Sequence, residues 1–221
     1  MLTRKTLIFL SDLKKNNDRN WFLAHKEAYL EAKQEFEGLV EELIGRIGAF
    51  DTSVKGLDPR KCSFRIFRDA RFSKDKSPYK TNFGAHIGAK ENKFEERSGY
   101  YLHVEPGNCF LGGGAYMPSS AWLKAIRSAI AEDGKFFRRL ITSPAFKKQF
   151  GAMEGETLKT APQGYSADHP HVDLLRHKNF LAMRKLKDAE LLAPGFGKAA
   201  AASFKALVPF ERFLNDVLED V

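Results

Sequence analysis

The first fifty residues follow a helical pattern of apolar positions. Leucines at helical spacing predict a short helix that Thr3 can cap and that ends in the polar turn Lys14–Asn20. A second helix is predicted from Trp21 to about Gly48, because apolar residues recur there every three or four positions. The buried face of this helix is expected to comprise Phe36, Leu39, Val40, Leu43, Ile44 and Ile47.

The middle of the chain changes to the alternating pattern of β-strands after the turn signal Asp58–Pro59. Strands are predicted over residues 62–68, 82–89, 99–105 and 108–113. The dipeptide Pro106-Gly107 is typical of a turn between two hairpin strands, and short connections favour antiparallel pairing. The link over residues 69–81 is long and charged, which is more typical of functional loops than of ordinary ones.

Helical signals return after Pro118. Ser119 or Ser120 is expected to cap one helix, and Ser143, followed by Pro144, another. Asp168 is predicted to cap a short helix. Residues 178–186 alternate like one more strand, and the C-terminus is helical with a break near residue 209.

Helices at both ends and strands between them indicate an α+β fold. We expect a central, mostly antiparallel sheet flanked by N-terminal and C-terminal helices. A chain of 221 residues fits a single domain spanning residues 1–221.

The composition excludes several protein classes. With 43% hydrophobic and 29% charged residues, the chain is neither disordered nor collagen-like, and two cysteines cannot form a disulfide scaffold. No apolar run approaches the roughly 18 residues that span a bilayer, so no membrane partner is expected. The N-terminal apolar run is too short for a secretory signal, which predicts a cytoplasmic location. The sequence also indicates no metal site and no cofactor.

Positive charge is concentrated in one segment. The net charge is +8, and residues 60–80 contain eight Lys or Arg and two Asp, so this segment alone carries +6. A localised positive field attracts anions. The candidate anion-binding residues are Arg65, Arg68, Arg71, Lys74, Lys76, Tyr79 and Lys80. The alternative is a solvated loop in which Asp69 and Asp75 form internal ion pairs; the interleaved apolar residues favour an ordered loop instead.

Two further patterns carry candidate chemistry near the predicted hairpin. The run Gly112, Gly113 and Gly114 is interpreted as a glycine loop whose N–H groups could approach an anion, or as a β-bulge or close backbone contact. His103 and Glu105 lie two residues apart on one strand and therefore share a face. They are candidates for proton transfer, with a plain surface pair as the alternative.

A third candidate is the sequence Asp168-His169-Pro170-His171. Asp168 and His169 are possible catalytic residues, although an Asp cap followed by exposed histidines explains the same pattern. No G-x-S-x-G or H-E-x-x-H motif accompanies these residues, so the sequence leaves open whether any reaction is catalysed.

The segment F-R-I-F-R-D-A-R-F-S-K-D-K-S-P-Y-K-T, ending at Thr81, resembles the domain-of-unknown-function 2461 family of bacterial and fungal proteins. Four other stretches are similar to the same family: N-N-D-R-N-W-F from Asn16, G-Y-Y-L-H-V-E-P-G from Gly99, the glycine run, and D-H-P from Asp168. The family has a histidine where this chain has Asn82. The resemblance spans nearly the whole chain and implies no particular activity.

The sequence therefore predicts a basic pocket for a small phosphate- or carboxylate-bearing ligand. The competing hypothesis is a nucleic-acid-binding module, in which the same segment tracks a phosphate backbone. Bases would then stack on Phe72, Tyr79, Tyr100 and Tyr101. Confinement of the charge to one strand and loop fits a compact pocket better, so nucleic acid is the second choice.

Overall fold

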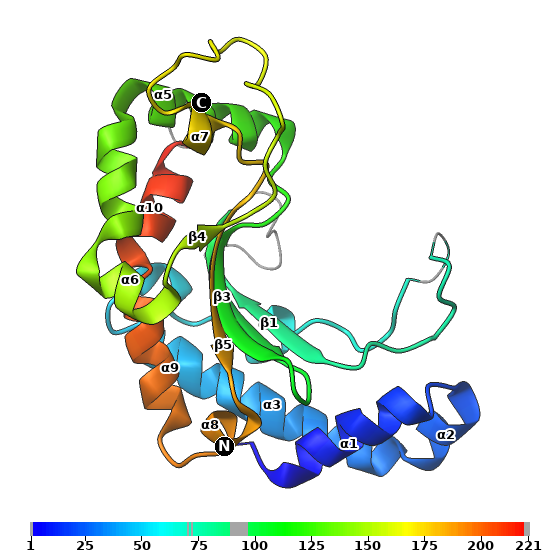
Figure 1. Ribbon diagram of the computed structural model, residues 1–221. Coiled ribbons are helices and arrows are strands. Elements are labelled where there is room, and N and C mark those ends of the chain that lie inside the picture. Colours follow the sequence, from blue (N-terminus) through cyan, green and yellow to red (C-terminus); the bar gives the residue numbers. More distant parts are fainter. Residues whose placement is uncertain (1, 70, 72, 89–96, 219–221) are drawn as a thin grey trace. The chain divides into compact units, whose positions relative to one another are not determined.

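The computed structural model describes residues 2–69, 71, 73–88 and 97–218 (Figure 1). Its principal helices are α1 (Arg4–Lys15), α2 (Arg19–Ala24), α3 (Lys26–Ile47), α5 (Ser120–Thr142), α6 (Pro144–Phe150), α9 (Phe196–Lys205) and α10 (Val208–Asp216). Short helical turns are η1 (Thr52–Val54), α4 (Pro59–Cys62), α7 (Val172–Leu175) and α8 (Asp188–Leu191). The strands are β1 (Phe83–Ile87), β2 (Gly99–Val104), β3 (Cys109–Ala115), β4 (Met153–Glu154) and β5 (Phe180–Leu186).

The five strands form one open antiparallel sheet in the order β1-β2-β3-β5-β4, and the fold is α+β as predicted. The chain groups into two compact units, and β2, β3 and β5 contribute residues to both. The first unit comprises Met1–Ile87, Tyr101–Leu111 and Lys185–Ala201. The second comprises Gly88–Tyr100, Gly112–Arg184 and Ala202–Val221. Within the described residues, no helix combines the length and apolarity that a membrane crossing requires.

In the first unit, α3 packs against β1 with the apolar stripe that its spacing predicts. All six residues of the predicted stripe are buried, and Phe36 stacks on Phe83 of β1 with ring centroids 5.3 Å apart. Thr3 caps α1 by accepting a hydrogen bond from the backbone N–H of Lys5. Glu35 of α3 accepts hydrogen bonds from the Thr3 N–H (2.9 Å) and the Thr6 hydroxyl (2.5 Å), which ties α1 to α3.

In the second unit, Ser119 caps α5 through the N–H of Trp122, and Ser143 caps α6 through the N–H of Phe146. The buried Trp122 indole donates a 2.7 Å hydrogen bond to the Leu214 carbonyl of α10. Phe137 packs edge-on against Phe180 of β5, with ring centroids 5.9 Å apart. Non-helical angles at Asp133 interrupt the α5 helix.

Two predictions near the N-terminus were wrong. The helix expected from Trp21 is two helices, because His25 adopts a non-helical conformation in which its ring stacks on Trp21 at 4.0 Å. The strand expected over residues 62–68 is not a continuous strand. Asp58 caps α4, which includes Cys62, and the residues after α4 form isolated bridges, such as that between Phe67 and Tyr79.

Two further predictions were wrong in the second half. The glycine run lies inside β3 and is not a loop after a strand. Asp168 does not cap α7, whose N-cap residue is His171. The strand predicted over residues 178–186 is confirmed as β5, and the short strand β4, which pairs Met153 with Ala182, was not predicted. The predicted strand over residues 82–89 forms β1, and its last residue lies outside the described part of the chain.

Candidate functional site

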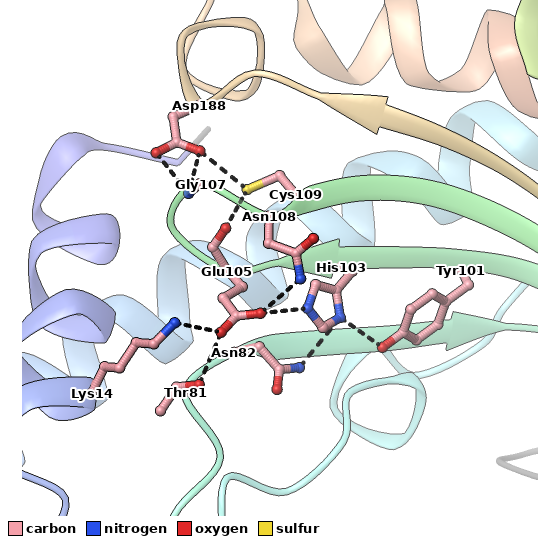
Figure 2. A network of polar contacts seen from close by, with 10 residues as sticks. All are labelled: Lys14, Thr81, Asn82, Tyr101, His103, Glu105, Gly107, Asn108, Cys109 and Asp188. Atoms are coloured by element: carbon pink, nitrogen blue, oxygen red, sulfur yellow. Dashed lines mark hydrogen bonds and ion pairs between the residues drawn. The ribbon is translucent and has the colours of Figure 1, made fainter.

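A row of polar side chains lies along β2 in the first unit, as Figure 2 shows. Tyr101, His103 and Glu105 are two residues apart, so the alternation of the strand directs all three to one face of the sheet. Glycine at position 84 makes room for the row, because a Cβ there would lie 2.6 Å from the Tyr101 hydroxyl. The predicted pairing of His103 with Glu105 on one face is therefore confirmed.

His103 lies at the centre of this row. Its Nδ1 is 3.1 Å from the Tyr101 hydroxyl and 3.5 Å from the Asn82 amide nitrogen, and its Nε2 is 3.5 Å from Glu105 Oε2. The imidazole also stacks on Phe110, with centroids 4.5 Å apart. Burial lowers the pKa of His103 below its ordinary value, although the Glu105 carboxylate opposes this shift. The ring is consequently neutral at neutral pH.

Glu105 is held as a carboxylate by four neighbours. The Asn108 amide donates at 2.9 Å, the Thr81 hydroxyl at 3.1 Å and the Lys14 ammonium at 3.4 Å. Burial alone would raise the pKa of Glu105, but these hydrogen bonds, the interaction with His103 and the charge of Lys14 together lower it. A fixed negative charge therefore faces the Nε2 edge of His103.

The turn after β2 is fixed by Asp188, which accepts hydrogen bonds from the N–H of Gly107 at 3.0 and 3.2 Å. Cys109 donates from its Sγ to the Glu105 carbonyl oxygen, 3.1 Å away. Burial, with a smaller effect of the Asp188 charge, raises the pKa of the Cys109 thiol to about 12. The buried Cys109 is therefore protonated at neutral pH, which disfavours attack by its sulfur.

Of this network, only His103 and Glu105 were predicted as site residues from the sequence. The alternation Tyr101-x-His103-x-Glu105 carries the signal for Tyr101, which was considered only as a base-stacking residue. The roles of Lys14, Asn82 and Asp188 depend on contacts between distant segments, and no local pattern indicates them.

Much of the basic segment is neutralised internally. Arg68 forms an ion pair with Asp75, and Arg71 forms a two-pronged pair with Asp69 at 2.7 and 2.9 Å. The hydrogen bonds from Arg71 lower the pKa of Asp69 to about 2, and those from Ser77 and Arg68 lower that of Asp75. Both carboxylates are ionised at neutral pH, so they offset two of the positive charges. These internal ion pairs are the ones expected in the alternative interpretation, in which the segment is a solvated loop and Asp69 and Asp75 pair with its cations.

The environments of Lys80 and Arg65 differ from those of Arg68 and Arg71. Lys80 is half-buried, and its ammonium lies 5.3 Å from the centroid of the Phe64 ring. Burial, and then the positive charge of Arg65, lower the pKa of Lys80. Among the described residues, no carboxylate forms an ion pair with either side chain. The charge of Arg65, which also contributes to the low pKa of Asp69, therefore acts on an ammonium that lies next to the Phe64 ring, and that ring lies 6.2 Å from the Tyr101 ring.

The remaining candidate residues of the basic segment are Lys74, Lys76 and Tyr79. Lys74 is exposed, and Lys76 donates to the Arg71 carbonyl oxygen. Tyr79 is buried and stacks on Phe22 at 4.0 Å. Tyr100 is buried as well, so neither ring is accessible for stacking on a base, contrary to the nucleic-acid hypothesis. Phe72, which that hypothesis also used, lies outside the described residues.

Asp168 and His169 belong to the second unit, in the turn before α7. Asp168 is exposed, and its N–H donates to Ser166, whereas His169 Nδ1 accepts from the N–H of His171. The polar row on β2 belongs to the first unit. The whole glycine run also lies in this unit, where Gly113 and Gly114 are packed closely against side chains and backbone.

No group of three or more His, Cys, Asp or Glu residues among those described is arranged to hold a metal ion. A cavity of about 300 Å³ lies among α1, α2 and α3 and shares no residue with the polar row. Its lining residues are Lys5, Ile8, Phe9, Asp12, Trp21, His25, Ala28, Glu31, Ala32 and Glu35.

Comparison with known proteins gives one match. The family described as "Conserved hypothetical protein (DUF2461)" matches residues 5–213. No curated protein matches the chain, and no solved structure matches it. The match covers nearly the whole chain and brings no activity with it.

Proposed function

We propose that this chain, which belongs to the DUF2461 family of conserved hypothetical proteins, binds a small phosphate- or carboxylate-bearing ligand. The anionic group of the ligand would lie against Lys80 and Arg65, next to Phe64 and the polar row on β2. Of the seven candidate anion-binding residues in the basic segment, we retain two cations, Lys80 and Arg65. We also infer that the protein is cytoplasmic.

The observation that carries the proposal is the unfavourable position of Lys80. A half-buried ammonium loses hydration, and a neighbouring guanidinium adds repulsion; both effects lower the pKa of Lys80. An anion placed between the two cations would remove the repulsion and gain charge-assisted hydrogen bonds. Arg68 and Arg71 gain less from an anion, because each already contacts a carboxylate.

The test is the binding of inorganic phosphate to the full chain, measured by calorimetry, for the wild type and for Lys80→Met. Loss of one charge-assisted contact should cost about 1.5–3 kcal/mol, which weakens binding roughly 10- to 150-fold. Lys74→Met is the matched control, because it removes the same charge from an exposed position of the same segment.

Lys74→Met should leave the affinity nearly unchanged if the anion has a defined site. Equal losses in the two variants would show that phosphate only responds to the total charge of the segment, and would contradict the proposal. Failure of the wild type to bind phosphate or a small carboxylate would contradict it as well.

Nucleic acid stays the second candidate. The internal ion pairs of Arg68 and Arg71 leave fewer unopposed cations for a phosphate backbone, which argues against it. Titration with a mixed oligonucleotide pool across a salt series separates the two: strong binding that falls steeply with salt would favour nucleic acid over the small ligand.

A further inference from the structure

We propose that the cavity among α1, α2 and α3 binds a small organic ammonium compound, that is, a positively charged amine with an apolar alkyl or aryl body. The cavity lies within the first unit, and neither Lys80 nor Arg65 lines it. The inference therefore does not rest on the proposed function.

The size of the cavity suits a small molecule. Helices α1 and α2 both pack against α3 (Figure 1), and the cavity lies where the three meet. Its volume of about 300 Å³ is at the lower end of the range for pockets that hold small molecules. Ala28 and Ala32 line it from α3, and their short side chains leave this space between the helices.

Aromatic packing holds one wall of the cavity in place. The Trp21 ring stacks on His25 at 4.0 Å, and the Phe9 ring of α1 lies 6.1 Å from Trp21. His25 Nδ1 lies 2.8 Å from the Trp21 carbonyl oxygen, which can only accept, so His25 donates. Stacking and this hydrogen bond together fix the His25 ring. A ligand therefore meets a preformed wall, which lowers the entropic cost of binding.

The lining offers apolar surface to the body of a ligand. Phe9 and Ala32 are buried, whereas Ile8 lines the cavity and still exposes 53% of its surface. Trp21, which also lines the cavity, is half-buried. An alkyl or aryl group that covers Ile8 and Trp21 would remove apolar surface from water, and this favours binding.

The charge of the lining selects a cation. Among the described residues that line the cavity, Asp12, Glu31 and Glu35 are acidic and Lys5 is basic. Lys5 lies 3.8 Å from Glu31, and Lys15, which is not in the lining, lies 3.3 Å from Asp12. Even with Lys15 included, the acids outnumber the lysines. The cavity is therefore locally negative in a chain whose net charge is +8.

Glu35 contributes most to this negative charge, because no side-chain cation forms an ion pair with it in the described part of the chain. It accepts hydrogen bonds from the Thr6 hydroxyl and from the N–H and hydroxyl of Thr3, which are all neutral groups. Burial raises the pKa of Glu35, but these hydrogen bonds and the charge of the chain's N-terminus lower it below its ordinary value. A fixed carboxylate therefore accompanies the apolar wall, and an ammonium group on an apolar body complements both.

The experiment compares two probes of the same shape, 2-phenylethylammonium and the uncharged 2-phenylethanol, in calorimetric titrations of the full chain. The wild type should bind the ammonium probe about 5-fold more tightly, the upper end for one exposed ion pair. Glu35→Gln keeps an oxygen that can accept from Thr6 and should reduce this preference. Glu41→Gln is the matched control, because Glu41 is an exposed residue of α3 outside the lining, and it should keep the preference.

A second pair of variants tests the location. Ala28→Leu places a larger side chain at the cavity from an exposed position, and it should abolish binding of both probes at concentrations that saturate the wild type. Ala202→Leu makes the same change at an exposed position of α9 in the second unit and should leave binding unchanged.

A spectroscopic measurement on the wild type needs no binding variant. The chain has two tryptophans, Trp21 in the lining and the buried Trp122 in the second unit. In a ¹H–¹⁵N spectrum, with the indole signals assigned by comparison with Trp21→Phe, 2-phenylethylammonium should shift the indole signal of Trp21 and not that of Trp122.

Several results would overturn the inference. Equal affinity for the two probes, or an undiminished preference in Glu35→Gln, would contradict selection of a cation. A shift confined to Trp122, or unchanged binding by Ala28→Leu, would contradict the location, and failure of the wild type to bind either probe would contradict both. None of these results changes the expected binding of phosphate at Lys80, so the proposed function stands or falls separately.

Discussion

At the scale of single residues, burial governs the titration of the histidines. His86 in β1, His103 in β2 and His177 all have a pKa below the ordinary value, and burial is the largest cause in each case. The shift is greatest for His86, whose pKa falls to about 4. A buried ring that resists protonation in the folded chain but accepts a proton in the unfolded chain makes stability depend on pH.

We therefore expect the free energy of unfolding to fall as the pH falls from about 6.5 to about 4. In this range the unfolded chain binds a proton at His86 that the folded chain does not, so His86 contributes a loss on the order of 3 kcal/mol. Above pH 6.5 the contribution of His86 is constant. Urea unfolding at several pH values, for the wild type and His86→Gln, measures it.

The comparison isolates His86, because titrating carboxylates affect both proteins alike. The stability curve of the variant should be flatter than that of the wild type between pH 6.5 and 4. Parallel curves would mean that His86 is protonated without cost in the folded chain.

At the residue scale the sequence predicts part of the site. The spacing of His103 and Glu105 is enough to place them on one face, since the side chains of a strand alternate. The choice of Lys80 and Arg65 among the cations is not predictable, because it depends on which acids the loop brings to Arg68 and Arg71. Lys14 lies 91 residues from Glu105 in the sequence, so no local sequence pattern predicts their contact.

At the scale of elements, close packing explains two residues of the glycine run in β3. A Cβ on Gly113 would lie 2.3 Å from Glu211 Oε1, and one on Gly114 would lie 2.0 Å from the Phe180 carbonyl oxygen. Gly114 also has a φ of +116°, which residues with side chains rarely adopt. Of the alternatives for this run, close backbone contact within the sheet accounts for Gly114, whereas Gly113 is packed first against the side chains of Glu211 and Leu207.

Replacement of Gly114 by Ala should destabilise the protein by about 3 kcal/mol or more, because a strained backbone and a clash with a backbone oxygen add together. Gly38→Ala in α3 is the matched control: nothing lies within 4 Å of its Cβ, and alanine favours a helix by about 1 kcal/mol. Thermal unfolding should shift in opposite directions for the two variants. A neutral Gly114→Ala would contradict the packing.

The elements with a long, unbroken period were predicted well, and those with overlapping signals were not. The stripe of α3 and the strands β2 and β5 have a clear spacing, and their tertiary burial agrees with it. Residues 62–68 also alternate, but the Asp58 cap and Pro59 begin α4 and leave only isolated bridges behind it. Asp168 has the chemistry of a cap, yet α7 begins four residues later, at Val172.

At the scale of the whole molecule, net charge and its placement have different consequences. The chain carries a net charge of +8, and the segment 60–80 carries most of it, yet Asp69 and Asp75 neutralise two arginines locally.

The α+β class can be deduced from the order of helical and alternating patterns, whereas the strand order depends on long-range pairing that no short pattern contains. We propose that the remaining charge forms a specific anion site at Lys80 and Arg65.

The most direct test is a crystal structure of the full chain after a soak in phosphate. We expect a phosphate within hydrogen-bond distance of both the Lys80 ammonium and the Arg65 guanidinium, with Arg68 and Arg71 still paired to Asp75 and Asp69. Lys80 and Arg65 directed apart into solvent with no phosphate between them, or phosphate bound instead to Arg68 and Arg71, would contradict it.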